Sequence, residues 1–239
     1  MHTFFLDTGH WLEPYALTGQ EAHHLSRVLR LGPGAQVHLI DGAGREGTFR
    51  VDDVAKNRVG LTPLSVVETP APSPRVVLAL GWTKGLRRGW LLEKAVELQA
   101  GGLWFWQAEH SQGRVPDAPK ETWSGKLMAG AKQCGNPWLP ELRTLPGGLK
   151  ELIEAGKNFE RTFVLHEDRR AGAPLSPSEV TAGGDALCVL GPEGGFAPGE
   201  AQALMDAGFS PISLGPSVLR WETAALATLS LFWWGGQHA

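Results

Sequence analysis

The chain has 239 residues, of which 42% are hydrophobic and 20% charged, the composition of a folded globular protein rather than a disordered one. Its formal net charge is -3, so the molecule lacks the overall positive charge of many nucleic-acid-binding proteins, and any RNA contact must use a local basic face. No basic segment followed by an apolar one begins the chain, and no apolar run is long enough to span a membrane. We therefore expect a cytoplasmic protein.

The first 69 residues are predicted to form a small β-rich domain that carries one helix. A helix is expected within residues 18–34, because Thr18 and Glu21 have the spacing of a capping box and Gly32, Pro33 and Gly34 stop the helix. Its apolar side would hold Ala22, Leu25, Val28 and Leu29, and its basic side His23, Arg27 and Arg30. Two strands are expected over residues 36–40 and 47–51, on either side of an Asp-Gly turn.

A proline-rich segment, Thr69 to Arg75, separates this region from the rest of the chain. Its alternating prolines and small residues impose an extended path, so we place a domain boundary there and predict domains at 1–69 and 70–239. After the boundary, apolar strand-like runs alternate with helical or polar sequence; the runs begin at residues 75, 103, 161 and 186. This alternation predicts an α/β domain with a mainly parallel sheet and a ligand site beyond the carboxyl ends of its strands.

Two glycine-containing loops lie between an expected strand and an expected helix. The first, "LGPEGGFAPGEAQAL" (190–204), lacks the spacing of a Walker loop or of a dinucleotide fingerprint, but its glycines allow backbone to approach a ligand closely. The second, "SLGPSVLRWETAALATLSLF" (213–232), places Arg220 and Glu222 beside the start of a helix that is apolar nearly all round. Taken alone, the first loop could be a structural corner, Arg220 and Glu222 could form a surface ion pair, and the helix could be core or a subunit interface.

Five ordered segments resemble the RsmE-type 16S ribosomal RNA uridine-N3 methyltransferases of the SPOUT superfamily. They are the two loops above, "HHLSRVLRLGPG", "KGLRRGWLLEKAVELQAGG" and "AGAKQCGNPWLPEL", which together extend from about residue 20 to residue 232. The resemblance implies an N-terminal PUA-like, RNA-binding β-barrel and a C-terminal methyltransferase domain whose chain end forms a trefoil knot. It also implies a homodimer acting on 16S rRNA of the small ribosomal subunit.

The family resemblance further implies that S-adenosylmethionine is held largely by backbone groups. The corresponding residues here are Leu165, His166, Gly191, Pro192, Glu193, Gly194, Gly195, Leu214, Gly215, Ser217, Val218 and Leu219. The chain departs from the usual family pattern at Ser217, Trp221, Lys132, Asn136 and Ala197, where arginine, threonine, glutamate, arginine and serine are common. The glycine scaffold is intact, so cofactor binding is expected whatever these polar positions do.

Methyl transfer to uracil N3 requires alignment of the nucleophile with the methyl group and removal of the imino proton. Arg220 is too basic to accept a proton, but it could stabilise negative charge on a uracil carbonyl oxygen. Glu193 and Glu222 are both candidates for the proton acceptor or for an orienting role. RNA contact is expected from basic residues in both regions: His23, Arg27, Arg30, Arg45, Lys84, Arg87 and Arg88.

Three other functions stay open at this stage. The chain could be a noncatalytic RNA-binding protein, a methyltransferase that modifies another RNA nucleotide, or an enzyme that binds NAD or ATP at the glycine-rich turn. No metal is expected, because His, Cys, Asp and Glu do not occur at a coherent ligand spacing. Cys134 and Cys188 are expected to be buried or idle thiols.

Overall fold

The computed structural model describes residues 1–85, 87–166 and 172–238. Its contacts divide the chain into two compact units: Met1–Ala71 with Met128–Leu139, and Pro72–Leu127 with Pro140–Ala239. The segment Met128–Leu139 thus groups with the first unit, although it lies within the region that the sequence assigns to the second domain. None of the helices in the described part of the chain is long and apolar enough to cross a membrane.

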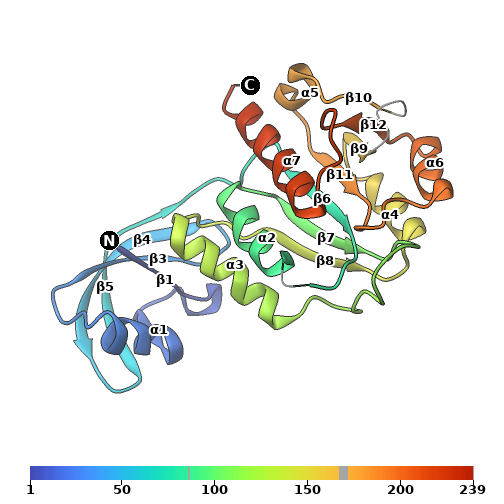
Figure 1. Cartoon of the computed structure of the whole chain (residues 1–239). Helices are drawn as coiled ribbons and strands as arrows, with labels where there is room; N and C mark the ends of the chain where they lie inside the picture. The colour runs from blue at the N-terminus through green and yellow to red at the C-terminus, as the bar shows by residue number, and fades with distance from the viewer. Residues whose placement is uncertain (86, 167–171, 239) are drawn as a thin grey trace. The chain divides into compact units, whose positions relative to one another are not determined.

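The first unit is built on a five-stranded sheet in the order β1-β3-β4-β5-β2 (Figure 1). The strands are β1 (His2–Phe5), β2 (Ala16–Thr18), β3 (Gln36–Ile40), β4 (Arg45–Val54) and β5 (Arg58–Glu68). β1 and β3 are parallel and the other pairs antiparallel. Phe4, Leu25 and Phe49 are fully buried in its core. The predicted strands at 36–40 and 47–51 are confirmed, the second as part of the longer β4.

The prediction of one helix within residues 18–34 is wrong in both its length and its cap. α1 covers only Gly19–His23 and continues as a π-helical turn over His24–Val28. The wider turn changes the helical phase, which leaves Val28 61% exposed on what was expected to be the apolar side.

Glu21 does not form the predicted capping box, because its carboxylate has other partners. Thr18 makes no side-chain capping bond. One Glu21 oxygen accepts the Phe5 backbone N–H at 3.1 Å, and the other lies 2.6 Å from Lys132 Nζ. Lys132, one of the departures from the family pattern, therefore fixes the last turn of α3 (Glu121–Cys134) to α1 within the first unit.

The second unit contains a seven-stranded sheet in the order β10-β12-β9-β11-β6-β7-β8, in which every neighbouring pair is parallel. The strands are β6 (Val76–Gly81), β7 (Gly102–Trp106), β8 (Glu141–Leu145), β9 (Arg161–Leu165), β10 (Ala173–Pro174), β11 (Ala186–Leu190) and β12 (Ser210–Ser213). The α/β class with a mainly parallel sheet is confirmed. Because β9, β11 and β12 are adjacent and parallel, the loops that follow them meet at one edge.

Helices pack on both faces of this sheet. α4 (Leu149–Gly156) and α6 (Pro198–Asp206) contribute to the cluster that covers one face. α2 (Arg87–Glu97) and α7 (Trp221–Gly236) contact each other, and α7 contacts β6 and β11 as well. Phe163 of β9 meets Phe232 of α7, whereas its neighbour Val164 belongs to the α4 and α6 cluster, as the alternation of side chains along a strand requires.

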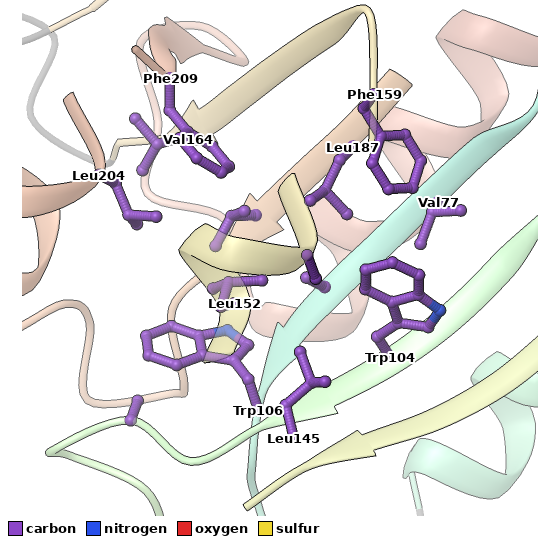
Figure 2. Packing of buried hydrophobic residues seen from close by; sticks show 14 residues of the cluster. Val77, Trp104, Trp106, Leu145, Leu152, Phe159, Val164, Leu187, Leu204 and Phe209 are labelled. Atoms are coloured by element: carbon purple, nitrogen blue, oxygen red, sulfur yellow. The ribbon is translucent and has the colours of Figure 1, made fainter. Parts of the chain in front are cut away.

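The α4 and α6 side of the sheet forms a continuous apolar core (Figure 2). Leu152 of α4 lies over Trp106 and Leu145, which come from adjacent strands. Phe159 meets Trp104 edge to face at a centroid distance of 5.5 Å. This packing fixes the strands whose carboxyl ends carry the loops.

The contact of α7 with α5 (Pro177–Thr181) depends on a glycine near the end of α7 (Figure 1). A Cβ at Gly235 would lie 2.2 Å from the Val180 carbonyl oxygen, whereas a Cβ at Gly236 would meet nothing within 4 Å. We expect Gly235→Ala to lower the free energy of unfolding by about 1–3 kcal/mol. Gly236→Ala is the matched control and should cause no loss. Chemical denaturation measures both, and equal stability of the two variants would contradict this packing.

Candidate active site

A cavity of about 410 Å³ lies at the carboxyl ends of β9, β11 and β12. It is lined by Leu165, His166, Leu190, Gly191, Pro192, Glu193, Gly195, Phe196, Ser213, Leu214, Gly215, Ser217, Val218, Leu219, Arg220, Trp221 and Ala224. All of these residues belong to the second unit. Both glycine-containing loops therefore face one space, which a parallel sheet produces when adjacent strands end together.

The first loop is held in shape by a tight turn and by close backbone packing. The Gly195 N–H donates to the Pro192 carbonyl oxygen at 2.9 Å, and Gly195 has a φ of 73°, a conformation that favours glycine. A Cβ at Gly191 would lie 3.0 Å from the Phe196 nitrogen. The backbone of this loop thus reaches the cavity wall without side chains in between.

The second loop also contains a local turn that requires glycine. Gly215 has a φ of 120°. The buried Ser213 hydroxyl accepts the Gly215 N–H at 3.2 Å. This hydrogen bond fixes the direction in which the chain leaves β12 before it reaches Arg220.

Stacked rings support the first loop. Phe196 stacks on Trp106 at a centroid distance of 6.0 Å and on His166 at 6.5 Å. The Trp106 Nε1–H donates to the carbonyl oxygen of Leu190, the last residue of β11, at 3.1 Å. The rings thus connect the ends of β7, β9 and β11 at the cavity.

The structure brings together all of the predicted cofactor-binding residues except Gly194, which does not line the cavity. The Gly194 carbonyl oxygen instead faces His110 Nδ1 at 3.1 Å. The sequence analysis did not select Leu190, Phe196, Ser213, Trp221 or Ala224 as cofactor-binding residues. These residues lie within or directly beside the two glycine-containing segments, and this position in the sequence could have indicated that they line the cavity.

The three candidates for the chemical step are not equivalent in position. Arg220 and Glu193 line the cavity from different loops, whereas Glu222 does not line it. Arg220 is exposed and makes no ion pair among residues 1–85, 87–166 and 172–238. Its guanidinium is therefore available to a bound molecule.

Trp221 contributes a buried donor at the same end of the cavity. Its side chain is 6% exposed, and its Nε1–H has no acceptor in the part of the chain that the structure describes. A buried indole N–H normally finds a partner. The cavity wall at this position therefore contains an indole ring.

The predicted RNA-binding residues fall into two groups. His23, Arg27, Arg30 and Lys84 are exposed. Arg45 donates to Asp41 at 2.7 Å and to the Thr8 carbonyl oxygen at 2.9 Å, so its guanidinium has structural partners. The Arg87 side chain lies outside the described residues.

Arg88 is also engaged within the second unit rather than displayed on an open basic face. Its guanidinium lies 4.3 Å from the Trp82 ring centroid and 5.0 Å from that of Trp123, and it donates to the Thr83 carbonyl oxygen. Burial lowers the pKa of this guanidinium. We therefore leave Arg45 and Arg88 out of the RNA-contacting surface proposed below.

The two cysteines differ in exposure, and the described residues hold no cluster of metal ligands. The described residues contain no group of three or more His, Cys, Asp and Glu side chains that could hold a metal ion. Cys188 is buried in β11, and burial raises the pKa of its thiol, which keeps it protonated. Cys134 is exposed and forms no disulfide.

Comparison with known proteins identifies the class of this site. Residues 69–233 match a family model described as an RNA methyltransferase domain, and residues 17–64 match an RNA methyltransferase PUA domain. Parallel strands ending in two glycine-containing loops, in a chain that also contains a PUA-like domain, thus define an RNA methyltransferase.

The particular family follows from relatives that match nearly the whole chain. The ribosomal RNA small subunit methyltransferase E of Mycobacterium bovis is 30% identical to this chain, and the match covers 88% of this chain and 82% of that protein. The Bacillus subtilis protein of the same name is 27% identical, and the match covers 90% of this chain and 88% of that protein. A crystal structure of the Neisseria gonorrhoeae protein of this name, bound to S-adenosyl methionine, has a TM-score of 0.81 at 27% identity and covers 96% of this chain and 95% of that one. The chain belongs to the ribosomal RNA small subunit methyltransferase E family.

The position of the first loop depends on Gly81 at the end of β6. A Cβ there would lie 2.3 Å from the Pro192 nitrogen, so Gly81→Ala must push the loop out of place. We expect this variant to remain folded and to bind S-adenosylmethionine at least tenfold more weakly in calorimetry. Gly199→Ala, whose Cβ would meet nothing within 4 Å, is the control. Unchanged affinity in Gly81→Ala would show that the loop position does not matter for binding.

Proposed function

We propose that this protein transfers a methyl group from S-adenosylmethionine to N3 of a uracil in 16S rRNA of the small ribosomal subunit. The observation that carries the proposal is the cavity at the ends of β9, β11 and β12, whose walls contain the two loops by which the sequence resembles its family. The Neisseria gonorrhoeae relative, solved with S-adenosyl methionine, supports the choice of cofactor. The target position itself rests on family resemblance.

Main-chain groups are suited to hold this cofactor. Glycines 191, 195 and 215 line the cavity and carry no side chain, so main-chain atoms form its surface at these positions and a ligand can approach the backbone closely. Apolar lining from Leu165, Leu190 and Phe196 provides surface for a flat base. The cofactor supplies an electrophilic methyl group on a sulfonium.

The proposed chemical step uses side chains from both loops. The methyl–sulfur bond breaks as the methyl–N3 bond forms, S-adenosylhomocysteine leaves, and the N3 proton passes to a base. Arg220 stabilises the negative charge that develops on a uracil carbonyl oxygen. Glu193 is favoured over Glu222 as the proton acceptor, because only Glu193 lines the cavity.

Exposed basic residues of both units would hold the RNA backbone. His23, Arg27 and Arg30 are exposed along α1 and the π-helical turn or just after them, and Lys84 is exposed after β6 in the second unit. Cations placed in this way bind phosphates without reading sequence. We assign residues 1–69 to RNA binding and residues 70–239 to the methyltransferase reaction.

The family resemblance leads us to propose a homodimer, a trefoil knot and a cytoplasmic location. α7 carries exposed Leu231, Trp233 and Trp234, a composition that suits a subunit interface. After β12 at one side of the sheet, the chain returns as α7 to β6 and β11, as the proposed knot requires. A cytoplasmic location follows from the proposed rRNA substrate.

Removal of the Arg220 guanidinium should impair the reaction more than cofactor binding. We expect Arg220→Ala to lower the methylation rate about 100- to 1,000-fold, the usual effect of losing one oxyanion donor. Its affinity for S-adenosylmethionine should stay within about twofold of the wild type. Single-turnover methylation and calorimetry provide the two values, and a wild-type rate in this variant would remove Arg220 from the mechanism.

RNA binding should depend on salt through the exposed cations. We expect the double variant Arg27→Ala/Arg30→Ala to reduce the slope of log affinity against log salt by roughly one unit per lost phosphate contact. The control Lys150→Ala/Lys157→Ala removes equal charge from the second unit and should keep the wild-type slope. Filter binding over a salt series measures both slopes; equal slopes in the two variants would exclude the proposed surface.

The direct test of function is incubation with labelled S-adenosylmethionine and either small subunits or naked 16S rRNA, followed by mass spectrometry of the product. The proposal predicts 3-methyluridine at one site. A different methylated nucleotide would establish the alternative target class. RNA binding without methyl transfer to either substrate would establish a noncatalytic protein.

A further inference from the structure

A further loop, which does not line the cavity, contacts the first glycine-containing loop (residues 191–197). This loop follows β7, and we call residues 107–113 the β7 loop. His110 Nδ1 lies 3.1 Å from the Gly194 carbonyl oxygen and 3.3 Å from that of Gly195. Gln112 Nε2 donates to a carboxylate oxygen of Glu193 at 2.5 Å. Three successive residues of the glycine-containing loop are thus contacted from the β7 loop.

The partners of His110 determine which ring nitrogen carries a hydrogen. A carbonyl oxygen only accepts hydrogen bonds, so Nδ1 must carry the hydrogen and donate to Gly194 and Gly195. Both the neutral ring in this tautomer and the protonated ring satisfy the contact. A Cβ at Gly194 would lie 3.1 Å from the His110 Cβ, so the glycine also permits the close approach of the ring.

Glu200 connects the same two loops from inside the protein. Its side chain belongs to a residue that is only 8% exposed, and its two oxygens accept different backbone N–H groups. One accepts from Glu109 at 2.8 Å and the other from Ala197 at 2.9 Å. The carboxylate thereby joins the β7 loop to the start of α6, where the glycine-containing loop ends.

The β7 loop has its own anchors, which do not depend on these side chains. The Gln112 N–H donates to the Trp82 carbonyl oxygen at 3.3 Å, and the Ala108 N–H donates to the Ser111 hydroxyl at 2.9 Å. Gln107 Oε1 accepts the Val115 N–H at 2.8 Å. Truncation of the exposed His110 or Gln112 therefore leaves the backbone of this loop in place.

We propose that His110 and Gln112 are positioning residues that hold the glycine-containing loop in its cofactor-binding shape. His110 fixes the backbone of Gly194 and Gly195, and Gln112 orients the Glu193 carboxylate. The inference rests on the proposed function of the cavity. A loop that is already ordered loses less conformational entropy on binding, so the support raises affinity without touching the ligand.

The two residues should affect different kinetic constants. His110→Ala removes the donor to the loop backbone and should raise the KM and the dissociation constant for S-adenosylmethionine about tenfold, with kcat little changed. Gln112→Ala should instead lower kcat, because Gln112 contacts the carboxylate proposed as the proton acceptor. If either residue had a purely structural role, its replacement would lower thermal stability but would not change KM in one variant and kcat in the other.

His110→Asn is the rescue variant, because the asparagine amide nitrogen can take the place of Nδ1 as donor. Gln202→Ala is the matched control: Gln202 is an exposed amide on α6 that donates only to Asp206 at 2.8 Å in the described structure. The experiment is calorimetry with S-adenosylmethionine and thermal melting of each purified full-length protein. Wild-type affinity in Gln202→Ala and near wild-type affinity in His110→Asn, with weak binding in His110→Ala, support the proposal.

Three results would overturn the inference, and they can be told apart. If the wild type binds S-adenosylmethionine and His110→Ala binds it equally well, the β7 loop does not position the site and the proposed function is unaffected. If the wild type does not bind the cofactor, the proposed function fails and the inference fails with it. A loss of affinity in His110→Ala that is accompanied by an equal loss of thermal stability, without rescue by His110→Asn, would assign His110 to the fold alone.

Discussion

The approach of backbone to backbone at the carboxyl ends of the parallel strands is the constraint on which the site depends. A Cβ at Gly81 would fall within 3 Å of Pro192 and Gly191 atoms, so the end of β6 and the first loop are in direct main-chain contact. Such packing leaves no room for side chains and little freedom for the loop. At the glycines of the first loop, main-chain atoms therefore form part of the cavity wall at fixed positions, beside side chains such as Phe196 and Arg220.

The rest of the second unit follows from keeping those strand ends together. Side chains on the two faces of each strand pack under different helices, so the sheet cannot slide without opening both cores. The parallel strands β11 and β12, which lie on either side of β9, then deliver Glu193 and Arg220 to one cavity, although the two residues lie in separate loops. The β7 loop adds hydrogen bonds from the side away from the cavity, and these hold the glycine-containing loop where the sheet places it.

The sequence predicted the features that follow from the periodicity of neighbouring residues or from motifs that occur in the same succession along the chain as in the family. The parallel sheet followed from apolar runs alternating with helices, and the expectation for most residues around the cavity came from the family resemblance. The helix at 18–34 was misjudged because the partners of Glu21 are remote: Phe5 is 16 residues away and Lys132 is 111 residues away. Capping-box spacing carries no information about such competitors.

The sequence also did not show which of several chemically similar side chains face the cavity or the solvent and which are held by other residues. Arg88 reads as part of a basic cluster, yet its guanidinium lies among Trp82, Phe105 and Trp123, which three separate segments bring together. Glu193 and Glu222 have the same chemistry, and only the fold shows that one lines the cavity. His110 follows β7 with no motif around it, so its contact with Gly194 depends on how the strands are ordered in the sheet.

The most direct test of the account is a crystal structure of the protein grown with S-adenosylmethionine. The account predicts the cofactor in the cavity between residues 191–195 and 214–219, with its polar atoms bound mainly to main-chain groups and its methyl group directed toward Arg220. Density for the cofactor at another place, or a fully occupied site held mainly by side chains, would contradict the central claim.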